Sequence, residues 1–232
     1  MIPANRNERE AASSLSVREM AATLAHEVKN PLSLVRACIN LLELDDEQGS
    51  HQKSYDLIKR ELDKINSLVT DMVDLTLVSP EYSAVDAGAL LGSLAAPFVQ
   101  AHPEIAFNLA IPDAELFITG NPSKLKLVLN NLIKNAIDAV EAAEPAAGKN
   151  IAVSLTADGG AAVFTIRDNG VGLPGVTFDT LTEPRFTTKR GGSGLGLYAS
   201  RVIVSQHGGK LCIINRPGGG CIVTVMIPMS ST

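Results

Sequence analysis

The chain lacks tryptophan altogether, and aromatic residues make up only 4% of its 232 residues. Proteins that bind single-stranded nucleic acid by base stacking need aromatic side chains on their surface. Basic residues are not in excess either, because 20 lysines and arginines stand against 25 aspartates and glutamates, a net charge of -5. Since the neutralisation of phosphates requires a basic surface, this composition argues against a general nucleic-acid binder and confines any anion site to a local cluster.

Long apolar runs are also missing. Stretches such as Ile222 to Met229 are shorter than the roughly 20 residues that a membrane span needs, and residues 1–10 have no apolar core of a signal peptide. We therefore expect no membrane segment in this chain and a cytoplasmic location, although a longer parent protein could be anchored in a membrane. The three cysteines, Cys38, Cys212 and Cys221, have no metal-ligand spacing and are predicted to be small buried apolar residues.

The front half of the chain has the composition of long helices. Between Ser16 and Leu77 there is one glycine, Gly49, and one proline, Pro31. After a break at residues 45–50, apolar residues recur in a heptad pattern, at Tyr55, Ile58, Leu62, Ile65, Val69 and Met72. This pattern predicts a helical hairpin. Because two helices cannot enclose such a seam, we expect two copies to meet as a dimeric four-helix bundle.

Several polar residues lie close together on the first of these helices. His26 lies off the apolar stripe, with Glu27 beside it and Asn30 one turn later, and Pro31 then bends the helix. A zinc protease helix would need a second histidine where Asn30 stands, so zinc is not expected. Taken alone, His26 could equally be a solvated surface residue.

After a linker at residues 78–88, the sequence pattern changes from long helices to a mixture of strands and helices. Expected helices lie near residues 89–102, 122–143 and 196–207, and expected strands near 106–111, 116–119, 151–156, 161–167, 210–215 and 221–227. Helices on one face of a mixed sheet make an α/β sandwich, and the whole chain is of the α+β class. The predicted organisation is an N-terminal segment at 1–15, a helical domain at 16–77, the linker at 78–88 and the sandwich domain at 89–232.

Three polar patterns in the sandwich domain favour a nucleotide site. Asn131, Asn135 and Asp138 share one face of the long helix, where amide oxygens suit Mg2+. The loop that begins at Asp168 follows a strand directly, and the Asp168 carboxylate can accept a hydrogen bond from the exocyclic amine of a base. A plain turn explains this loop sequence about as well. Residues 187–197 combine hydroxyls, two cations and four glycines before a helix, which is typical of a phosphate-binding loop, without the order of a P-loop.

The motifs His-Glu-x-x-Asn-Pro, Asn-x-x-x-Asn-Ala, Asp-Asn-Gly-Val-Gly, Phe-Thr-Thr-Lys and Gly-x-Gly-Leu-Gly-Leu follow one another in this chain. In this order, with Phe-Thr-Thr-Lys between the last two, they resemble the H, N, G1 and G2 boxes of bacterial sensor histidine kinases, and the resemblance extends from about Ser16 to Pro228. The Glu-Pro-x-Phe-Thr-Thr-Lys form is most similar to the nitrogen-regulatory type. The resemblance implies an enzyme that uses ATP and Mg2+ to phosphorylate its own histidine and passes the phosphoryl group to an aspartate in the receiver domain of a response regulator.

The resemblance also implies a role for each matching residue. His26 would accept the phosphoryl group, Glu27 would hold or deprotonate its imidazole, and Asn30 would orient water in a phosphatase reaction. Asn135 would bind Mg2+, Asn131 would lie on the phosphate side, and Asp168 would bind the adenine amine. Asp138 is a weaker candidate for the nucleotide site than these three residues. Gly170 and Gly172 would open the base pocket. The lid and phosphate loop would comprise Thr187, Thr188, Lys189, Gly192, Gly194 and Gly196.

The sequence departs from the family in the lid, where Thr182 and Arg185 stand at positions that are often aromatic. Three alternatives remain open. The same nucleotide fold serves ATPases and protein-serine kinases, and a non-catalytic phosphotransfer scaffold is a third class. His26 favours the histidine kinase, because none of the other enzymes requires a histidine-bearing hairpin before the nucleotide fold.

Overall fold

The computed structural model describes residues 32–40, 55–59, 61–62, 65, 82–143, 148–184, 186–189 and 194–230. The chain divides into two compact units, one of Met1–Val78 with Thr188–Ser193 and one of Ser79–Thr187 with Gly194–Thr232. Within the first unit, residues 32–40 and 55–59 are helical, and Val35 and Cys38 are buried. These helical segments agree with the predicted helical hairpin. None of the helices in the described ranges is both long and apolar enough to cross a membrane.

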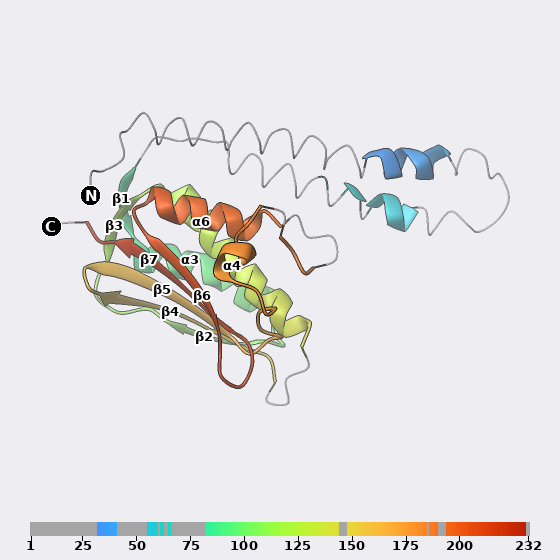
Figure 1. Ribbon diagram of the computed structural model, residues 1–232. Coiled ribbons are helices and arrows are strands. Elements are labelled where there is room, and N and C mark those ends of the chain that lie inside the picture. Colours follow the sequence, from blue (N-terminus) through green and yellow to red (C-terminus); the bar gives the residue numbers. More distant parts are fainter. Residues whose placement is uncertain are drawn as a thin grey trace. The chain divides into compact units, whose positions relative to one another are not determined.

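The second unit contains the α/β elements (Figure 1). In chain order they are β1 (Ser83–Asp86), α3 (Ala87–Ala101), β2 (Ala106–Ala110), β3 (Phe117–Gly120), α4 (Pro122–Glu141), β4 (Asn150–Asp158), β5 (Ala161–Asp168), α5 (Phe178–Leu181), α6 (Gly196–Gln206), β6 (Lys210–Asn215) and β7 (Cys221–Pro228).

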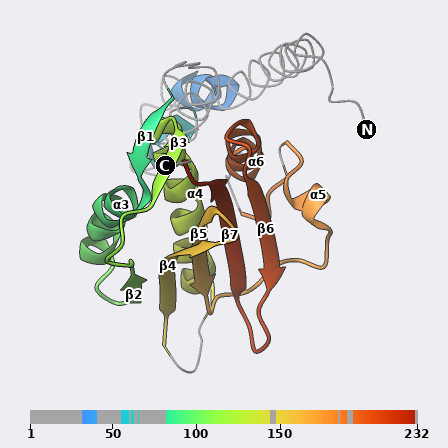
Figure 2. The same ribbon diagram turned by 90° about the vertical axis from the view of Figure 1, so that its left-hand side faces the viewer.

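Five strands form the main sheet, in the order β2-β4-β5-β7-β6. β2 runs parallel to β4, whereas the other neighbours are antiparallel. The helices α3, α4 and α6 lie on one face of this sheet (Figure 2). The predicted α/β sandwich with a mixed sheet is therefore confirmed.

The alternation of buried and exposed side chains along the strands explains which face of the sheet the helices cover. In β4 the side chains of Ile151, Val153 and Leu155 are buried, while the residues between them are partly exposed. Side chains on a strand point alternately to its two sides, so one apolar face is available to the helices. α4 supplies much of the opposing surface through its buried residues Leu125, Val128, Leu129, Leu132, Ile133, Ala136, Ile137 and Val140.

The start of α4 is determined by its first residues. Asn121 is the N-cap, and its side-chain oxygen accepts a hydrogen bond from the backbone N–H of Lys124 at 3.0 Å. Pro122 follows, where a helix needs no N–H from it. The cap fixes the point at which α4 begins, and with it the position of every polar residue along the helix.

The structure differs from the expected elements in two places. The segment expected to be a linker, residues 78–88, contains β1 and the start of α3, and β1 pairs with β3 in a separate two-stranded sheet. The four-residue helix α5 was also not predicted. Both elements are short and depend on tertiary pairing or packing, so neither produces a periodic pattern in the sequence.

Candidate functional site

The predicted site residues fall into two groups. His26, Glu27, Asn30 and Gly192 lie outside the described residues. The others are described, and they come from α4, from the loop after β5, from residues 187–189 and from the start of α6. Thr187, Thr188 and Lys189 are exposed.

Asn131 links α4 to the glycine-rich start of α6. Its side-chain Nδ2 donates a hydrogen bond to Ser200 Oγ at 2.9 Å, and Ser200 Oγ donates in turn to the carbonyl of Gly196 at 2.9 Å. Ser200 is completely buried. A Cβ placed on Gly196 would collide with the side chain of Asn131. The structure thus brings two predicted site residues, Asn131 and Gly196, into direct contact.

Asn135 and Asp138 follow Asn131 along α4. Asn135 is half-buried and Asp138 is exposed. The side-chain oxygen of Asn135 is a hard ligand of the kind that Mg2+ prefers, and Mg2+ usually binds through few protein oxygens together with phosphates and water. The donor set on this face of α4 fits a magnesium ion that is held partly by a bound nucleotide.

The N-cap of α6 is Leu195, whose apolar side chain makes no capping hydrogen bond. Gly194 just before it has φ +67°, a left-handed conformation that glycine adopts without strain. The positive end of a helix dipole favours an anion, so the start of α6 suits the phosphates of a nucleotide.

Asp168 ends β5 and is 3% exposed. The backbone N–H groups of Gly170 and Cys221 donate to its Oδ1 at 2.9 and 3.2 Å. Burial raises the pKa of this carboxyl, although the two hydrogen bonds and the positive charge of Arg216 act in the opposite direction. Among the described residues, both hydrogen bonds to the carboxylate end on Oδ1, which leaves Oδ2 as an acceptor for a ligand amine.

The loop after β5 is positioned against α4. Val171 N–H donates to the carbonyl of Ala139 at 3.2 Å. A Cβ on Gly170 would collide with the backbone of Ala139. Gly172 has φ +75°, and Asn215 Oδ1 accepts a hydrogen bond from the N–H of the next residue, Leu173, at 2.7 Å. The glycines of this loop are therefore required by close packing and backbone conformation.

Two further residues that position Asp168 were not predicted. Asn169 accepts from the N–H of Asn150 at 2.8 Å and donates to the carbonyl of Gly148 at 2.7 Å, so it ties the loop to the start of β4. Gly220 has φ +84°, and a Cβ there would collide with the carbonyl of Asp168. The sequence contains no signal for this contact between Gly220 and Asp168.

The segment after β5 is also attached to α6. Arg201 Nη1 donates to Thr182 Oγ1 at 2.8 Å and forms an ion pair with Asp179 at 3.2 Å. Thr182 is 1% exposed, and its hydroxyl donates to the carbonyl of Phe178 at 2.9 Å. Thr182, one of the two positions at which the sequence departs from the resemblance, therefore anchors α5 by hydrogen bonds. Arg185 lies outside the described residues.

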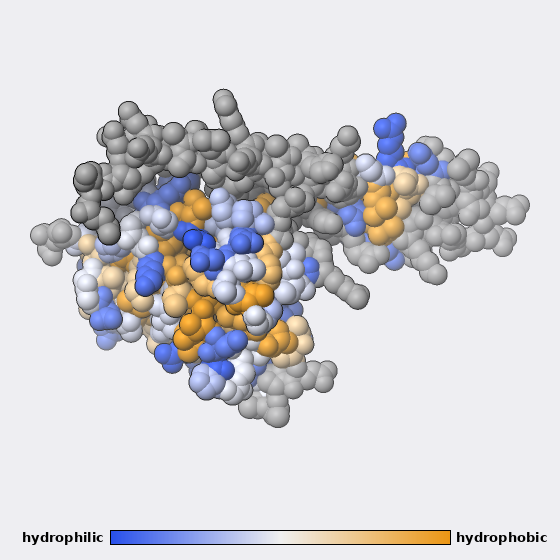
Figure 3. Space-filling model, in the orientation of Figure 1, coloured by the Kyte–Doolittle hydropathy of each residue, from blue (hydrophilic) through white to orange (hydrophobic). Residues whose placement is uncertain are grey.

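The surface of this unit is partly apolar, and Figure 3 shows hydrophobic residues among hydrophilic ones on the face turned toward the viewer. Exposed apolar side chains in the described part include Val171 and Val176 in the loop after β5 and Ile214 on β6. Val171, at 61% exposure, lies between the two glycines of the Asp168 loop.

Comparison with known families gives two matches. Residues 16–79 match the His Kinase A (phospho-acceptor) domain, and residues 120–231 match the histidine kinase-, DNA gyrase B- and HSP90-like ATPase family. The first match contains His26, Glu27 and Asn30. The second contains the predicted nucleotide-binding residues of α4, the loop after β5 and α6.

Among curated proteins, the chain is 33% identical to sporulation kinase B of Bacillus subtilis, over 91% of this chain and 50% of that protein. It is 31% identical to the sensor histidine kinase ZraS of Escherichia coli, over 94% of this chain and 47% of that protein. The chain therefore spans about half the length of these relatives. A crystal structure of the histidine kinase ThkA in complex with the response regulator protein TrrA is similar in fold, with a TM-score of 0.74 and 24% identity over 96% of this chain and 65% of that chain.

Proposed function

Because the chain belongs to the sensor histidine kinases of two-component systems, we propose that it phosphorylates its own His26 with ATP and passes the phosphoryl group to an aspartate of a response regulator. The observation that carries this proposal is the buried carboxylate of Asp168, held through Oδ1 at the end of β5, in a chain whose residues 16–79 match a phospho-acceptor domain. A nucleotide site and a phosphoryl acceptor are the two parts that the reaction needs.

ATP would bind between the three positioned elements of the second unit. Oδ2 of Asp168 accepts a hydrogen bond from the adenine amine, and the glycines of its loop allow the base to approach the backbone. The phosphates lie toward the start of α6. Asn135 would hold Mg2+, which neutralises phosphate charge when bound. Asn131 positions the first turn of α6 through Ser200 and presents its side chain to Gly196.

The chemical step joins an imidazole nitrogen of His26 to the γ-phosphorus of ATP. The bond from that phosphorus to the oxygen it shares with the β-phosphate breaks, and ADP leaves with the electron pair. Glu27 accepts the proton from the other ring nitrogen, so the phosphorylated imidazole becomes neutral. The phosphoryl group then moves from nitrogen to a carboxylate oxygen of the response regulator. Positioning and charge neutralisation supply most of the rate enhancement in such transfers.

We further propose a homodimer formed through the helices of residues 16–77. The heptad seam supports it, and so do the exposed apolar side chains of Leu32 and Ile39, which are 48% and 43% exposed in the single chain. The proposal also includes a cytoplasmic site of action, where ATP and response regulators are found, and a phosphatase reaction that depends on Asn30. The similarity to the nitrogen-regulatory type stays a prediction.

The test is incubation of the chain with γ-labelled ATP and Mg2+, followed by acid and alkali treatment, since phosphohistidine is labile to acid and stable to alkali. We expect label with this stability, its loss in His26→Gln, and its retention in His51→Gln, a matched change within the same domain. ATP affinity should be nearly the same in all three proteins. Acid-stable label would indicate a protein-serine kinase, and ATP hydrolysis without label would indicate an ATPase. The absence of both, with ATP bound, would indicate a phosphotransfer scaffold.

A further inference from the structure

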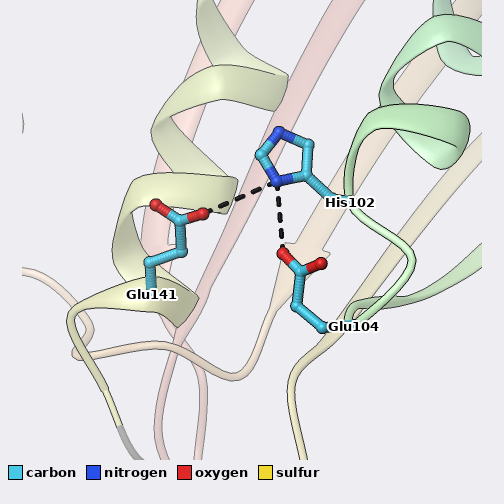
Figure 4. Close-up of side chains that lie close together, drawn as sticks. All are labelled: His102, Glu104 and Glu141. Carbon is cyan, nitrogen blue, oxygen red and sulfur yellow. Dashed lines mark hydrogen bonds and ion pairs between the residues drawn. The ribbon is translucent and has the colours of Figure 1, made fainter.

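Three side chains that the kinase motifs do not use meet at the ends of two helices (Figure 4). His102 is the C-cap of α3, Glu104 lies in the turn that follows, and Glu141 is the last residue of α4. Nδ1 of His102 lies 3.3 Å from Oε1 of Glu104 and 3.5 Å from Oε1 of Glu141. One ligand atom from each residue lies within 4.8 Å of the others. One imidazole nitrogen thus faces two carboxylates.

The charges around this cluster favour a cation. The C-terminal end of a helix carries partial negative charge, and here the ends of α3 and α4 meet two carboxylates. Neither helix has a basic residue in its last turn. A side-chain carboxylate at the end of α4 is unfavourable unless a positive charge joins it.

The distances from Nδ1 of His102 to the two carboxylate oxygens are compatible with a bound metal ion, and the shorter one is also within reach of a hydrogen bond to Glu104. An N–H···O hydrogen bond is about 2.7–3.2 Å long, and the single proton that Nδ1 can carry points to only one acceptor. Metal–ligand bonds of about 2.1 Å in a tetrahedral site place the ligand atoms roughly 3.4 Å apart. The separations from Nδ1 of His102, 3.3 and 3.5 Å, lie on either side of that value, and the two carboxylate oxygens lie within 4.8 Å of each other.

We propose that His102, Glu104 and Glu141 form a binding site for a divalent transition metal, with Zn2+ as the ion that best suits one imidazole nitrogen and two carboxylates, and with water as the fourth ligand. The side chains are 27%, 50% and 45% exposed, so an ion and its water can enter from solvent. A bound ion joins the end of α3, the approach to β2 and the end of α4. Ala139, which receives the hydrogen bond of Val171, lies in the last turn of α4.

The test is titration of the full chain with Zn2+ alone, without nucleotide, by calorimetry and by thermal unfolding. We expect saturable binding of one ion that raises Tm and that is at least tenfold weaker in Glu141→Gln and in Glu104→Gln. These residues are exposed, so their amides should leave the fold intact. Asp158→Asn, which removes a carboxylate at the opposite end of β4, is the matched control and should bind Zn2+ like the parent chain.

Other histidines and the cysteines could also bind Zn2+, so the ring of His102 provides a second measurement. Metal bound to Nδ1 changes the 15N chemical shift of that nitrogen. At stoichiometric Zn2+ we expect this change in the parent chain and in Asp158→Asn, but not in Glu104→Gln or Glu141→Gln. Binding weaker than millimolar would overturn the proposal. So would equal affinity in the parent and the two glutamine variants, because the cluster would then be only an ion pair of a protonated histidine. Neither readout depends on kinase activity.

Discussion

The side-chain amide of Asn131 on α4 donates a hydrogen bond to the hydroxyl of Ser200 on α6 over 2.9 Å. Because Ser200 donates a second hydrogen bond to the carbonyl of Gly196, α4 holds the first turn of α6, where we propose that the phosphates bind. Asn131 therefore has a positioning role that is visible without any nucleotide. Its proposed contact on the phosphate side is compatible with this role, because its oxygen faces Gly196.

The first prediction is that Ser200→Ala weakens ATP binding and lowers stability. The change leaves the partly buried Nδ2 of Asn131 without this acceptor. A fully buried donor that loses its partner costs about 1–3 kcal/mol, so the cost here should lie at or below the lower end of that range. We expect ATP affinity to fall by about tenfold, measured by calorimetry, with a lower urea midpoint. Ser205→Ala, an exposed serine on the same helix, should change neither quantity. Unchanged ATP affinity and stability in Ser200→Ala would show that the hydrogen bond between Asn131 and Ser200 contributes to neither.

The second prediction concerns Gly196, the first residue of α6. Alanine usually stabilises a helix by about 1 kcal/mol relative to glycine, but here its Cβ would collide with the side chain of Asn131. Gly196→Ala should therefore destabilise the chain and reduce ATP binding. Adding Asn131→Ala should restore part of the stability but not the binding. Gly175→Ala is the control, since a Cβ there meets nothing within 4 Å. An increase in stability from Gly196→Ala alone would contradict the contact.

The third prediction separates function from stability at Asp168. Burial raises the pKa of this carboxyl, so its charge at neutral pH reduces the stability of the fold. Asp168→Asn keeps an oxygen for the N–H groups of Gly170 and Cys221 and removes the charge. We expect the free energy of unfolding to stay equal or rise, while ATP affinity falls on the order of 10- to 100-fold because an NH2 group now faces the adenine amine.

A nucleotide without that amine provides the control for Asp168. Inosine triphosphate has a carbonyl in place of the amine, so its binding should fall less in Asp168→Asn than that of ATP, or should improve. The measurement is the ratio of the two dissociation constants in the parent chain and in the variant. An equal loss for both nucleotides would mean that Asp168 supports the loop and does not recognise the base.

Regular elements of the fold could be predicted because they follow from local patterns. The strands expected near residues 151–156 and 161–167 and the helix expected near residues 122–143 match β4, β5 and α4 to within a few residues. β1 could not be predicted in the same way. Its four residues form a strand only because β3, more than 30 residues later, supplies the hydrogen bonds.

The site shows the same division between local and long-range information. Spacing along α4 predicted that Asn131 and Asn135 share a face, and the glycines of the Asp168 loop were visible as a motif. The contacts that position them join residues far apart in the chain, such as Arg201 with Thr182, or Cys221 N–H with Asp168. A single sequence contains no pattern for such pairs, since nothing near one partner in the chain identifies the other.

The last prediction concerns His207, a buried histidine at the end of α6. Its Nε2 accepts a hydrogen bond from the backbone N–H of Asn121 at 3.0 Å, and its Nδ1 donates to the carbonyl of Ile203 at 2.7 Å. These bonds require a neutral ring with its proton on Nδ1. Burial lowers the pKa of His207, the charge of Lys124 lowers it further, and the bond to Ile203 opposes both. Protonation would place a second donor against the N–H of Asn121, the cap of α4.

The sign of the pH dependence follows from this shift. The folded pKa lies below the unfolded value of about 6.5, so the unfolded chain binds more protons between the two values. The contribution of His207 to stability is complete above pH 6.5 and declines as the pH falls from there toward the folded pKa, by at most about 1.4 kcal/mol per pH unit. Urea unfolding of the parent chain and of His207→Gln between pH 5.5 and 7.5 measures it. Glutamine can accept from Asn121 but does not titrate, so the variant should show a shallower decline, and parallel curves would exclude His207 as the source.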